Sequence, residues 1–174
     1  MPVLISLLTH PREIDRKTNT GKLAINLELA TLFCWQRTAP DPQLLGCITQ
    51  YNTALLYLTE QTDTTLAATH NATAITPQLA VQAYEHIIIV DATWQEARKI
   101  VNRSPYLQPL PRCILTPKSP SIFSLRRNQK EQGLCTAECV ITILEACERT
   151  HDANTLRHAL TQFIACYGRN ENAP

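Results

Sequence analysis

Three short polar stretches carry the residue types that could do chemistry. The first, His10 to Gly21 (HPREIDRKTNTG), follows an apolar run and joins a histidine and several cations to turn-forming residues. The second is Asp91-Ala92-Thr93-Trp94, which follows the apolar run His86 to Asp91. The third is the proline-punctuated stretch from Thr116 to Thr136. Loops at the carboxyl edge of a parallel sheet are where ligands bind in open α/β folds, so we expect a site there.

Several roles are open for the residues of these stretches. Asp91 could serve as a general base at the end of a buried strand, or it could cap the helix that follows. Trp94 offers an aromatic face to a cationic ligand or to a stacked base, or it packs in the core. The first stretch has the turn chemistry for an anion-binding helix start, and an ordinary strand-turn-helix connection is the alternative.

The basic residues are concentrated in one part of the chain. Eight Lys or Arg side chains and no acidic residue lie between Arg98 and Lys130, although the formal charge of the whole chain is only +1. A basic sector in an otherwise acidic chain predicts a docking face for a polyanion such as RNA, whose binding would weaken steeply with salt. A merely solvated loop is the alternative.

Composition excludes several classes of protein. The chain has 174 residues, 44% of them hydrophobic, which fits a single compact domain. The few glycines form no dinucleotide-binding or P-loop motif. The cysteines lack a C-x2-C pair, so we expect free thiols and no metal site. The run Met1 to Thr9 lacks the features of a signal peptide, and no apolar run is long enough to span a membrane. We therefore expect a soluble cytoplasmic protein.

Hydrophobic periodicity predicts the elements that position these stretches. Four apolar runs predict the strands of a mostly parallel sheet: Val3 to Thr9, Ala54 to Leu58, His86 to Asp91 and Cys113 to Thr116. Helical spacing predicts helices over Ile25 to Phe33, Leu79 to Ala83, Ala97 to Val101, Ala137 to Leu144 and Leu156 to Tyr167. For the last helix, Asp152 is a candidate N-cap and Gly168 a candidate end. We expect an α/β fold with helices on both sheet faces, one domain over 1–168 and a flexible tail over 169–174.

The order of the motifs resembles that of the DTW-domain family. The matching motifs are His10-Pro11-Arg12-Glu13, Asn19-Thr20-Gly21, Asp91-Ala92-Thr93-Trp94 with Glu96-Ala97-Arg98-Lys99, Ser124-Leu125-Arg126, and Leu134-Cys135-Thr136-Ala137-Glu138. The resemblance implies a tRNA-uridine aminocarboxypropyltransferase, which places the 3-amino-3-carboxypropyl group of S-adenosylmethionine on N3 of a uridine and releases methylthioadenosine. It also implies a SPOUT-like fold with a C-terminal trefoil knot, an exception to the rule against threaded connections.

The resemblance also implies roles for individual residues. Asp91 and Trp94 are the expected catalytic residues: Asp91 accepts or orients the N3 proton or holds the methionine ammonium, and Trp94 lies beside the sulfonium and its methyl. The residues expected to bind S-adenosylmethionine are Tyr57, Leu58, Thr59, Ala92, Thr93, Trp94, Leu115, Thr116, Pro117, Leu134, Cys135, Thr136 and Ala137. The residues expected to bind tRNA are His10, Arg12, Arg16, Lys17, Asn19, Thr20, Arg98, Lys99, Arg126 and Arg127. Of these, Arg12 or Arg126 could pair with the methionine carboxylate or with a phosphate.

Three departures from the family pattern accompany the resemblance. No cysteine cluster precedes the first predicted strand, Leu56-Tyr57-Leu58 lacks the usual proline, and Ala92 stands where Gly or Ser is frequent. An RNA methyltransferase on the same fold, a non-catalytic RNA-binding module and a structural scaffold are the alternatives. The oligomeric state, monomer or homodimer, stays open.

Overall fold

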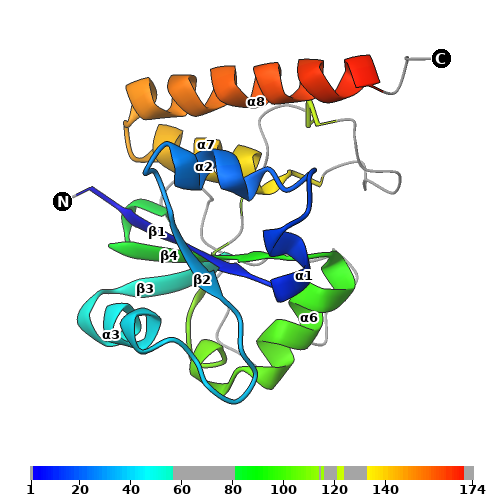
Figure 1. The fold of residues 1–174 in the computed structure, drawn as a ribbon. Coiled ribbons are helices and arrows are strands. Elements are labelled where there is room, and N and C mark those ends of the chain that lie inside the picture. Colours follow the sequence, from blue (N-terminus) through cyan, green and yellow to red (C-terminus); the bar gives the residue numbers. More distant parts are fainter. Residues whose placement is uncertain (1, 57–80, 114, 116–120, 124–132, 171–174) are drawn as a thin grey trace.

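The protein, described here from a computed structural model, is built on a five-stranded sheet (Figure 1). The structure describes residues 2–56, 81–113, 115, 121–123 and 133–170. The strands lie in the order β2-β1-β4-β3-β5, and every pairing is parallel. Their bounds are β1 Leu4–Thr9, β2 Thr31–Cys34, β3 Thr53–Leu56, β4 His86–Asp91 and β5 Arg112–Cys113. The predicted parallel sheet is therefore confirmed.

Helices cover both faces of this sheet, as the sequence predicts (Figure 1). They are α1 Pro11–Ile14, α2 Gly21–Asn26, α3 Pro42–Gln50, α6 Trp94–Arg103, α7 Thr136–Ala146 and α8 Thr150–Asn170, with a 3-10 turn η1 at Pro105–Leu107. Helices α2, α7 and α8 lie on one side, and α3 and α6 lie on the other. Along β4, Ile87 and Ile89 face the first group, whereas Ile88 faces the second. Because both faces are buried, the strand is a continuous apolar run.

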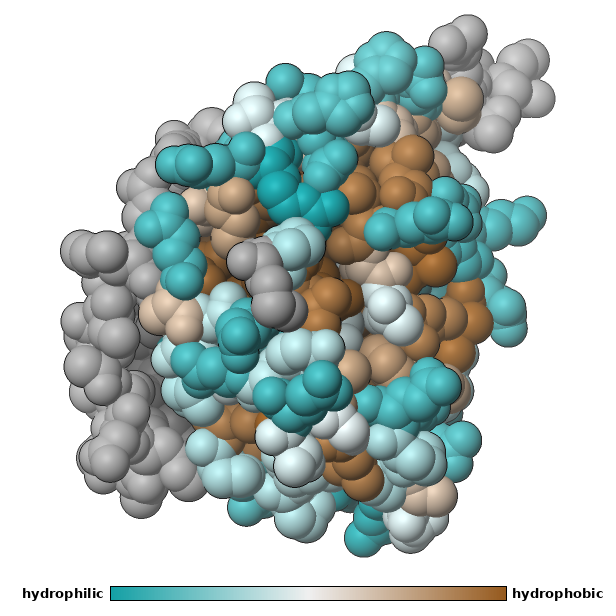
Figure 2. Space-filling view, turned by 90° about the vertical axis from the view of Figure 1, so that its left-hand side faces the viewer, coloured by the Kyte–Doolittle hydropathy of each residue, from teal (hydrophilic) through white to brown (hydrophobic). Residues whose placement is uncertain are grey.

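The carboxyl ends of the two central strands form the edge where the candidate residues meet. Thr9 ends β1 directly beside Asp91, which ends β4. Helices α1 and α6 both begin at this edge, on the right of Figure 1. Figure 2, which shows the opposite end of the molecule, has apolar and hydrophilic residues side by side at its surface. Thr9 and Asp91 thus lie together at the carboxyl edge of the sheet, from which α1 and α6 start.

Several predicted elements differ from the structure. The helix predicted over Ile25 to Phe33 is wrong in its second half: α2 ends at Asn26, and Leu32 and Phe33 belong to β2. Backbone pairing with the edge of β1 determines that conformation. Helix α3 was not predicted, although Asp41 caps it and Pro42 occupies its first position.

The ends of the last helix also differ from the prediction. Helix α8 begins at Thr150 and continues past Gly168 to Asn170. Asp152 lies in its first turn and pairs with Arg149 (Nε to Oδ2, 2.7 Å), so it is not the N-cap.

Some predictions fall partly or wholly outside the described residues. These are residues 57–58 of the strand predicted over Ala54 to Leu58, residues 114 and 116 of the strand predicted over Cys113 to Thr116, residues 79–80 of the helix predicted over Leu79 to Ala83, and residues 171–174 of the tail. The connection in which a knot would form includes residues 114, 116–120 and 124–132, which also lie outside, so the knot stays a prediction. In the described part of the chain, every helix is too short or too polar to cross a bilayer.

A buried histidine joins three strands at the end of the sheet opposite to Asp91. His86 Nε2 lies 2.7 Å from Ser6 Oγ, and its Nδ1 lies 3.0 Å from Thr53 Oγ1. Because the Thr53 hydroxyl donates to the Tyr51 carbonyl, it accepts from the ring, and Ser6 donates to Nε2. The neutral ring is thus fully bonded, and burial lowers the pKa of His86 from 6.5 to about 4.

We predict that this histidine makes the fold sensitive to acid. Below about pH 6.5 the His86 ring is protonated in the unfolded chain but stays neutral in the folded chain. The free energy of unfolding is therefore highest above about pH 6.5 and falls as the pH approaches 4. Between about pH 7 and pH 4, the free energy of unfolding should fall by about 3 kcal/mol more in the wild type than in His86→Gln. Denaturant titrations at both pH values measure the free energy of unfolding.

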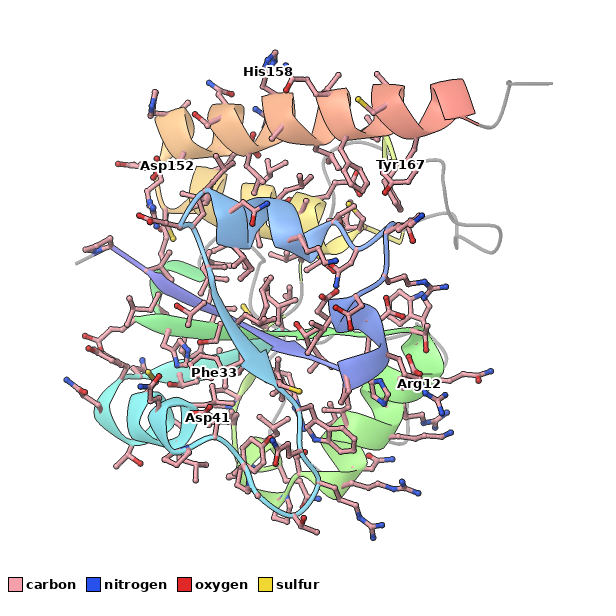
Figure 3. All side chains as sticks on the ribbon, viewed as in Figure 1. Arg12, Phe33, Asp41, Asp152, His158 and Tyr167 are labelled. Atoms are coloured by element: carbon pink, nitrogen blue, oxygen red, sulfur yellow. The ribbon has the colours of Figure 1, made fainter. Side chains whose placement is uncertain are left out.

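The exposed His158, at the top of Figure 3, provides the control. His158→Gln should show the same pH dependence of the free energy of unfolding as the wild type. If His86→Gln also showed the wild-type pH dependence, the assignment to His86 would be refuted.

Candidate functional site

Asp91 is the centre of the candidate site. Its side chain is 3% exposed, and three hydroxyl or amide groups donate to it. Thr136 Oγ1 lies 2.7 Å from Oδ1, Asn19 Nδ2 lies 2.9 Å from Oδ2, and the Thr9 hydroxyl lies 3.4 Å from Oδ2. One carboxylate thus joins the ends of β1 and β4, the turn before α2 and the start of α7. A carboxylate has about four acceptor positions, so capacity for a further donor remains.

The turn before α2 is fixed by a second set of hydrogen bonds. Asn19 donates to the Glu13 carbonyl (2.8 Å) and accepts from the Gly21 amide (2.7 Å). The Thr20 hydroxyl accepts from the Ala137 amide at the start of α7 (3.3 Å). Asn19 and Thr20, which we expected to contact RNA, are buried and bonded to the protein itself. Their geometry suits the positioning of Asp91.

The start of α6 is capped by Thr93, so the alternative in which Asp91 caps this helix is wrong. The Thr93 hydroxyl accepts from the Glu96 amide (3.4 Å), and Glu96 Oε2 accepts from the Thr93 amide (3.3 Å) and hydroxyl (2.8 Å). Partial burial acts to raise the pKa of Glu96, but the bonds to Thr93 and the charges of His10 and Arg12 lower it below its usual value. The Thr-x-x-Glu spacing of a capping box is a signal that could have identified this cap.

His10 lies between the ends of β1 and β2 and the start of α6. Its Nδ1 accepts from the Arg12 amide (3.2 Å) and lies 3.9 Å from Glu96 Oε1. Its ring stacks on Trp35, with centroids 5.8 Å apart and an interplanar angle of 23°. Trp35, which the sequence did not single out, donates from Nε1 to Ser104 Oγ (2.9 Å). These contacts fix the ring of a residue predicted to bind RNA.

The predicted RNA-binding cations divide into two groups. Arg12 is exposed on α1, beside α6 in Figure 3, and Arg98 and Lys99 are exposed on α6 itself. Lys17 is exposed as well, and its backbone carbonyl accepts from Tyr167, whereas the exposed Arg16 pairs with the buried Glu13 (Nη1 to Oε1, 2.5 Å). The positive charge of α1 and α6 therefore lies next to the edge that holds Asp91.

The described members of the predicted S-adenosylmethionine-binding set differ in burial, and one of them, Thr136, bonds to Asp91. Leu115, Cys135, Thr136 and Ala137 are buried, while Ala92, Trp94 and Leu134 are partly buried and Thr93 is exposed. Burial, with the adjacent Glu138 carboxylate, raises the pKa of the Cys135 thiol to about 12, so this cysteine is a poor nucleophile. The remaining predicted site residues lie outside the described part of the chain: Tyr57, Leu58, Thr59, Thr116, Pro117, Arg126 and Arg127.

Glu138 has a positioning role that the sequence analysis missed. Its buried carboxylate accepts from the Cys135 amide (2.7 Å), the Ser121 hydroxyl (2.6 Å) and the Ile122 amide (2.8 Å). It thereby holds residues 121–123 against the start of α7. Its position three residues after Cys135 is the signal that could have identified it.

The described residues hold no evident metal centre. Within the described ranges, no three His, Cys, Asp or Glu side chains are grouped so as to hold an ion. The cysteines are free thiols.

We predict that the absence of a side chain at Gly21 is required for this arrangement. A Cβ there would lie 3.0 Å from Asn19 Oδ1, 3.0 Å from Asp91 Oδ2 and 3.1 Å from a methyl of Leu7. Gly21→Ala should therefore lower the free energy of unfolding by about 1–3 kcal/mol, as chemical denaturation would measure.

The exposed Gly46 in α3 is a matched control, because a Cβ there would meet nothing within 4 Å. Gly46→Ala should raise stability by about 0.5–1 kcal/mol, since alanine favours a helix interior. If the two variants were equally stable, the close packing around Gly21 would be disproved.

The chain resembles a solved structure and matches a family model. The structure is that of the SAM-dependent rRNA:acp-transferase Tsr3 from Vulcanisaeta distributa, with 14% sequence identity and a TM-score of 0.49 over 97% of this chain and 85% of that one. The family model is that of the DTW domain, and it matches residues 1–168. Because that match covers nearly the whole chain, the protein belongs to the DTW-domain family.

Proposed function

We propose that this protein transfers the 3-amino-3-carboxypropyl group of S-adenosylmethionine to N3 of a uridine in tRNA. The family supports a transferase of this kind. The observation that carries the proposal is the convergence of three signature motifs on one carboxylate. Asn19, Asp91 and Thr136, far apart in the sequence, form one hydrogen-bonded cluster at the carboxyl edge of the sheet. This edge is where open α/β folds bind their ligands.

The proposed reaction forms one bond and breaks another. The N3 atom of uridine attacks the methionine Cγ, the bond between that carbon and the sulfonium sulfur breaks, and methylthioadenosine leaves with the bonding pair. The N3 proton passes to a base, so the products are neutral methylthioadenosine, the modified uridine and a proton. When bound, S-adenosylmethionine supplies a sulfonium with three electrophilic carbons. The protein must therefore select the carbon by orientation.

The described residues suit such a donor. The acceptor position that remains on Asp91 fits an ammonium or an N–H group, and the partly buried Trp94 offers an aromatic face within one helical turn of the strand end. The donors already on Asp91 hold its carboxylate rigidly, which favours a role in orienting a reacting group over one that requires the side chain to move.

The exposed cations support RNA as the acceptor. Arg12 on α1 and Arg98 and Lys99 on α6 are exposed, and both helices begin at the edge that holds Asp91. Arginine and lysine side chains bind phosphates without sequence preference and position the nucleic acid. Binding of the RNA backbone to these cations would then bring the target base to the Asp91 carboxylate.

The test is incubation of the purified protein with unmodified bulk tRNA and labelled S-adenosylmethionine, followed by nucleoside mass analysis. We predict 3-(3-amino-3-carboxypropyl)uridine and methylthioadenosine as products. Asp91→Asn should slow the transfer by at least about 100-fold, because the reacting group loses its orienting carboxylate.

The control is Asp15→Asn, because Asp15 is an exposed aspartate at the end of α1. This variant should react at the wild-type rate. Methylated uridine with S-adenosylhomocysteine would instead identify a methyltransferase, and full activity in Asp91→Asn would remove Asp91 from the mechanism.

A further inference from the structure

A pocket of about 240 Å³ opens beside Asp91, on the side of the sheet that carries α2. Its walls are mostly apolar, and a few polar side chains converge on it, which is the usual form of a small-molecule site. Leu7, Ile14, Ile25 and Leu32 form its apolar walls, and Asp91 and Lys22 are its charged groups. Pockets for drug-sized ligands measure about 300–1,000 Å³, so this one suits a single ring rather than a whole nucleotide cofactor.

The polar side of the pocket requires a hydrogen-bond donor from the ligand. Asp91 lines the pocket. Its Oδ2 already accepts from Asn19 (2.9 Å) and Thr9 (3.4 Å), whereas its Oδ1 accepts from Thr136 (2.7 Å), so the remaining acceptor position is on Oδ1. Both amide hydrogens of Asn19 are already used, on the Glu13 carbonyl and on Asp91. Asp91 therefore offers the ligand an acceptor, and Asn19 has no amide hydrogen left to donate to the ligand.

The charge at the pocket's mouth adds a second requirement. Lys22 lines the pocket and is exposed to solvent. An ammonium in that position suits an anionic group on the part of the ligand that stays outside. A ring with one N–H donor, flat apolar faces and an attached phosphate satisfies the acceptor, the walls and the cation together.

We propose that this pocket receives the uracil ring of the target nucleotide, with its N3–H directed at Asp91 and its phosphate near Lys22. This inference rests on the proposed function and names the subsite for its acceptor. In a nucleotide, N3–H is the only N–H group of the uracil ring. Cytosine has a lone pair at N3, which the carboxylate repels, so the pocket distinguishes the two pyrimidines.

The Asp91 carboxylate also lies between the segment expected to hold S-adenosylmethionine and the pocket proposed for uracil. Asp91 lines the pocket and is bonded through Oδ1 to Thr136 at the start of α7, in the segment expected to hold S-adenosylmethionine. A uracil ring seated in the pocket would present its N3 atom to the Asp91 carboxylate and to S-adenosylmethionine. Asp91 is thus placed to orient N3–H and to receive its proton as the new bond forms.

Two exposed leucines on neighbouring strands provide a matched test. Leu32 on β2 lines the pocket and is 42% exposed, whereas Leu4 on β1 is 38% exposed and does not line it. We predict that Leu32→Trp fills the pocket and lowers kcat/KM for tRNA by at least about 10-fold, with the calorimetric affinity for S-adenosylmethionine unchanged. Leu4→Trp should match the wild type in both.

Nuclear magnetic resonance tests the pocket without any transfer reaction. Uridine 5′-monophosphate should shift the amide resonances of Asn19 and Gly21 in the wild type and not in Leu32→Trp. Cytidine 5′-monophosphate should shift neither. Lys22→Gln, a change at an exposed position, should weaken the response to uridine 5′-monophosphate more than the response to uridine.

The outcomes separate this inference from the proposed function. If the wild type modifies tRNA and Leu32→Trp has the same kcat/KM, the pocket is not the uracil subsite, and the transfer activity stands. If no transfer occurs but the uridine-specific shifts appear and are lost in Leu32→Trp, the pocket stands and the proposed reaction fails. Equal shifts from both pyrimidines would overturn the inference.

Discussion

The buried carboxylate of Asp91 is the constraint on which the site depends. A carboxylate that is 3% exposed is costly to hold unless donors replace its lost water. The structure supplies those donors from Asn19, Thr136 and Thr9, which belong to three separate parts of the chain. Because all three donors must reach one carboxylate, the end of β1, the turn before α2 and the start of α7 lie together. This edge is assembled by the same hydrogen bonds that replace the water lost when Asp91 is buried.

The parallel sheet makes this convergence possible. Because β1 and β4 run side by side in the same direction, Thr9 and Asp91 end at one edge, and the segments that follow both strands begin there. Helix α7 then lies across the face above them, fixed by Glu138 to residues 121–123 and by Ala137 to Thr20. A rigid wall and an adjoining pocket result, next to the exposed cations of α1 and α6. Recognition of a polyanion and orientation of one of its bases would thus take place at one end of the molecule.

The sequence predicted those helices and strands whose hydrophobic residues follow one regular spacing. Strands β1 and β4 are apolar on both faces, and the larger apolar residues of α7 and α8 follow helical spacing, so hydrophobic periodicity identified these elements. Strand β2 was missed because Leu32 and Phe33 also fit the helical spacing that starts at Ile25, and only pairing with β1 resolves the choice. The site prediction included both Asp91 and Thr136 but not the bond between them. They are 45 residues apart, and no local spacing encodes a contact of that range.

A double-mutant cycle on that bond tests the central claim most directly. The free energies of unfolding of Asp91→Asn, Thr136→Val and the double variant are measured by denaturant titration. If Asp91 and Thr136 act as one unit, the double variant loses less than the sum of the single losses, by about 1–3 kcal/mol. A cycle of Asp91→Asn with Thr142→Val is the control, because Thr142 on the same helix bonds to the Glu138 carbonyl and not to Asp91. Additivity within about 0.5 kcal/mol in the Asp91–Thr136 cycle would contradict the account.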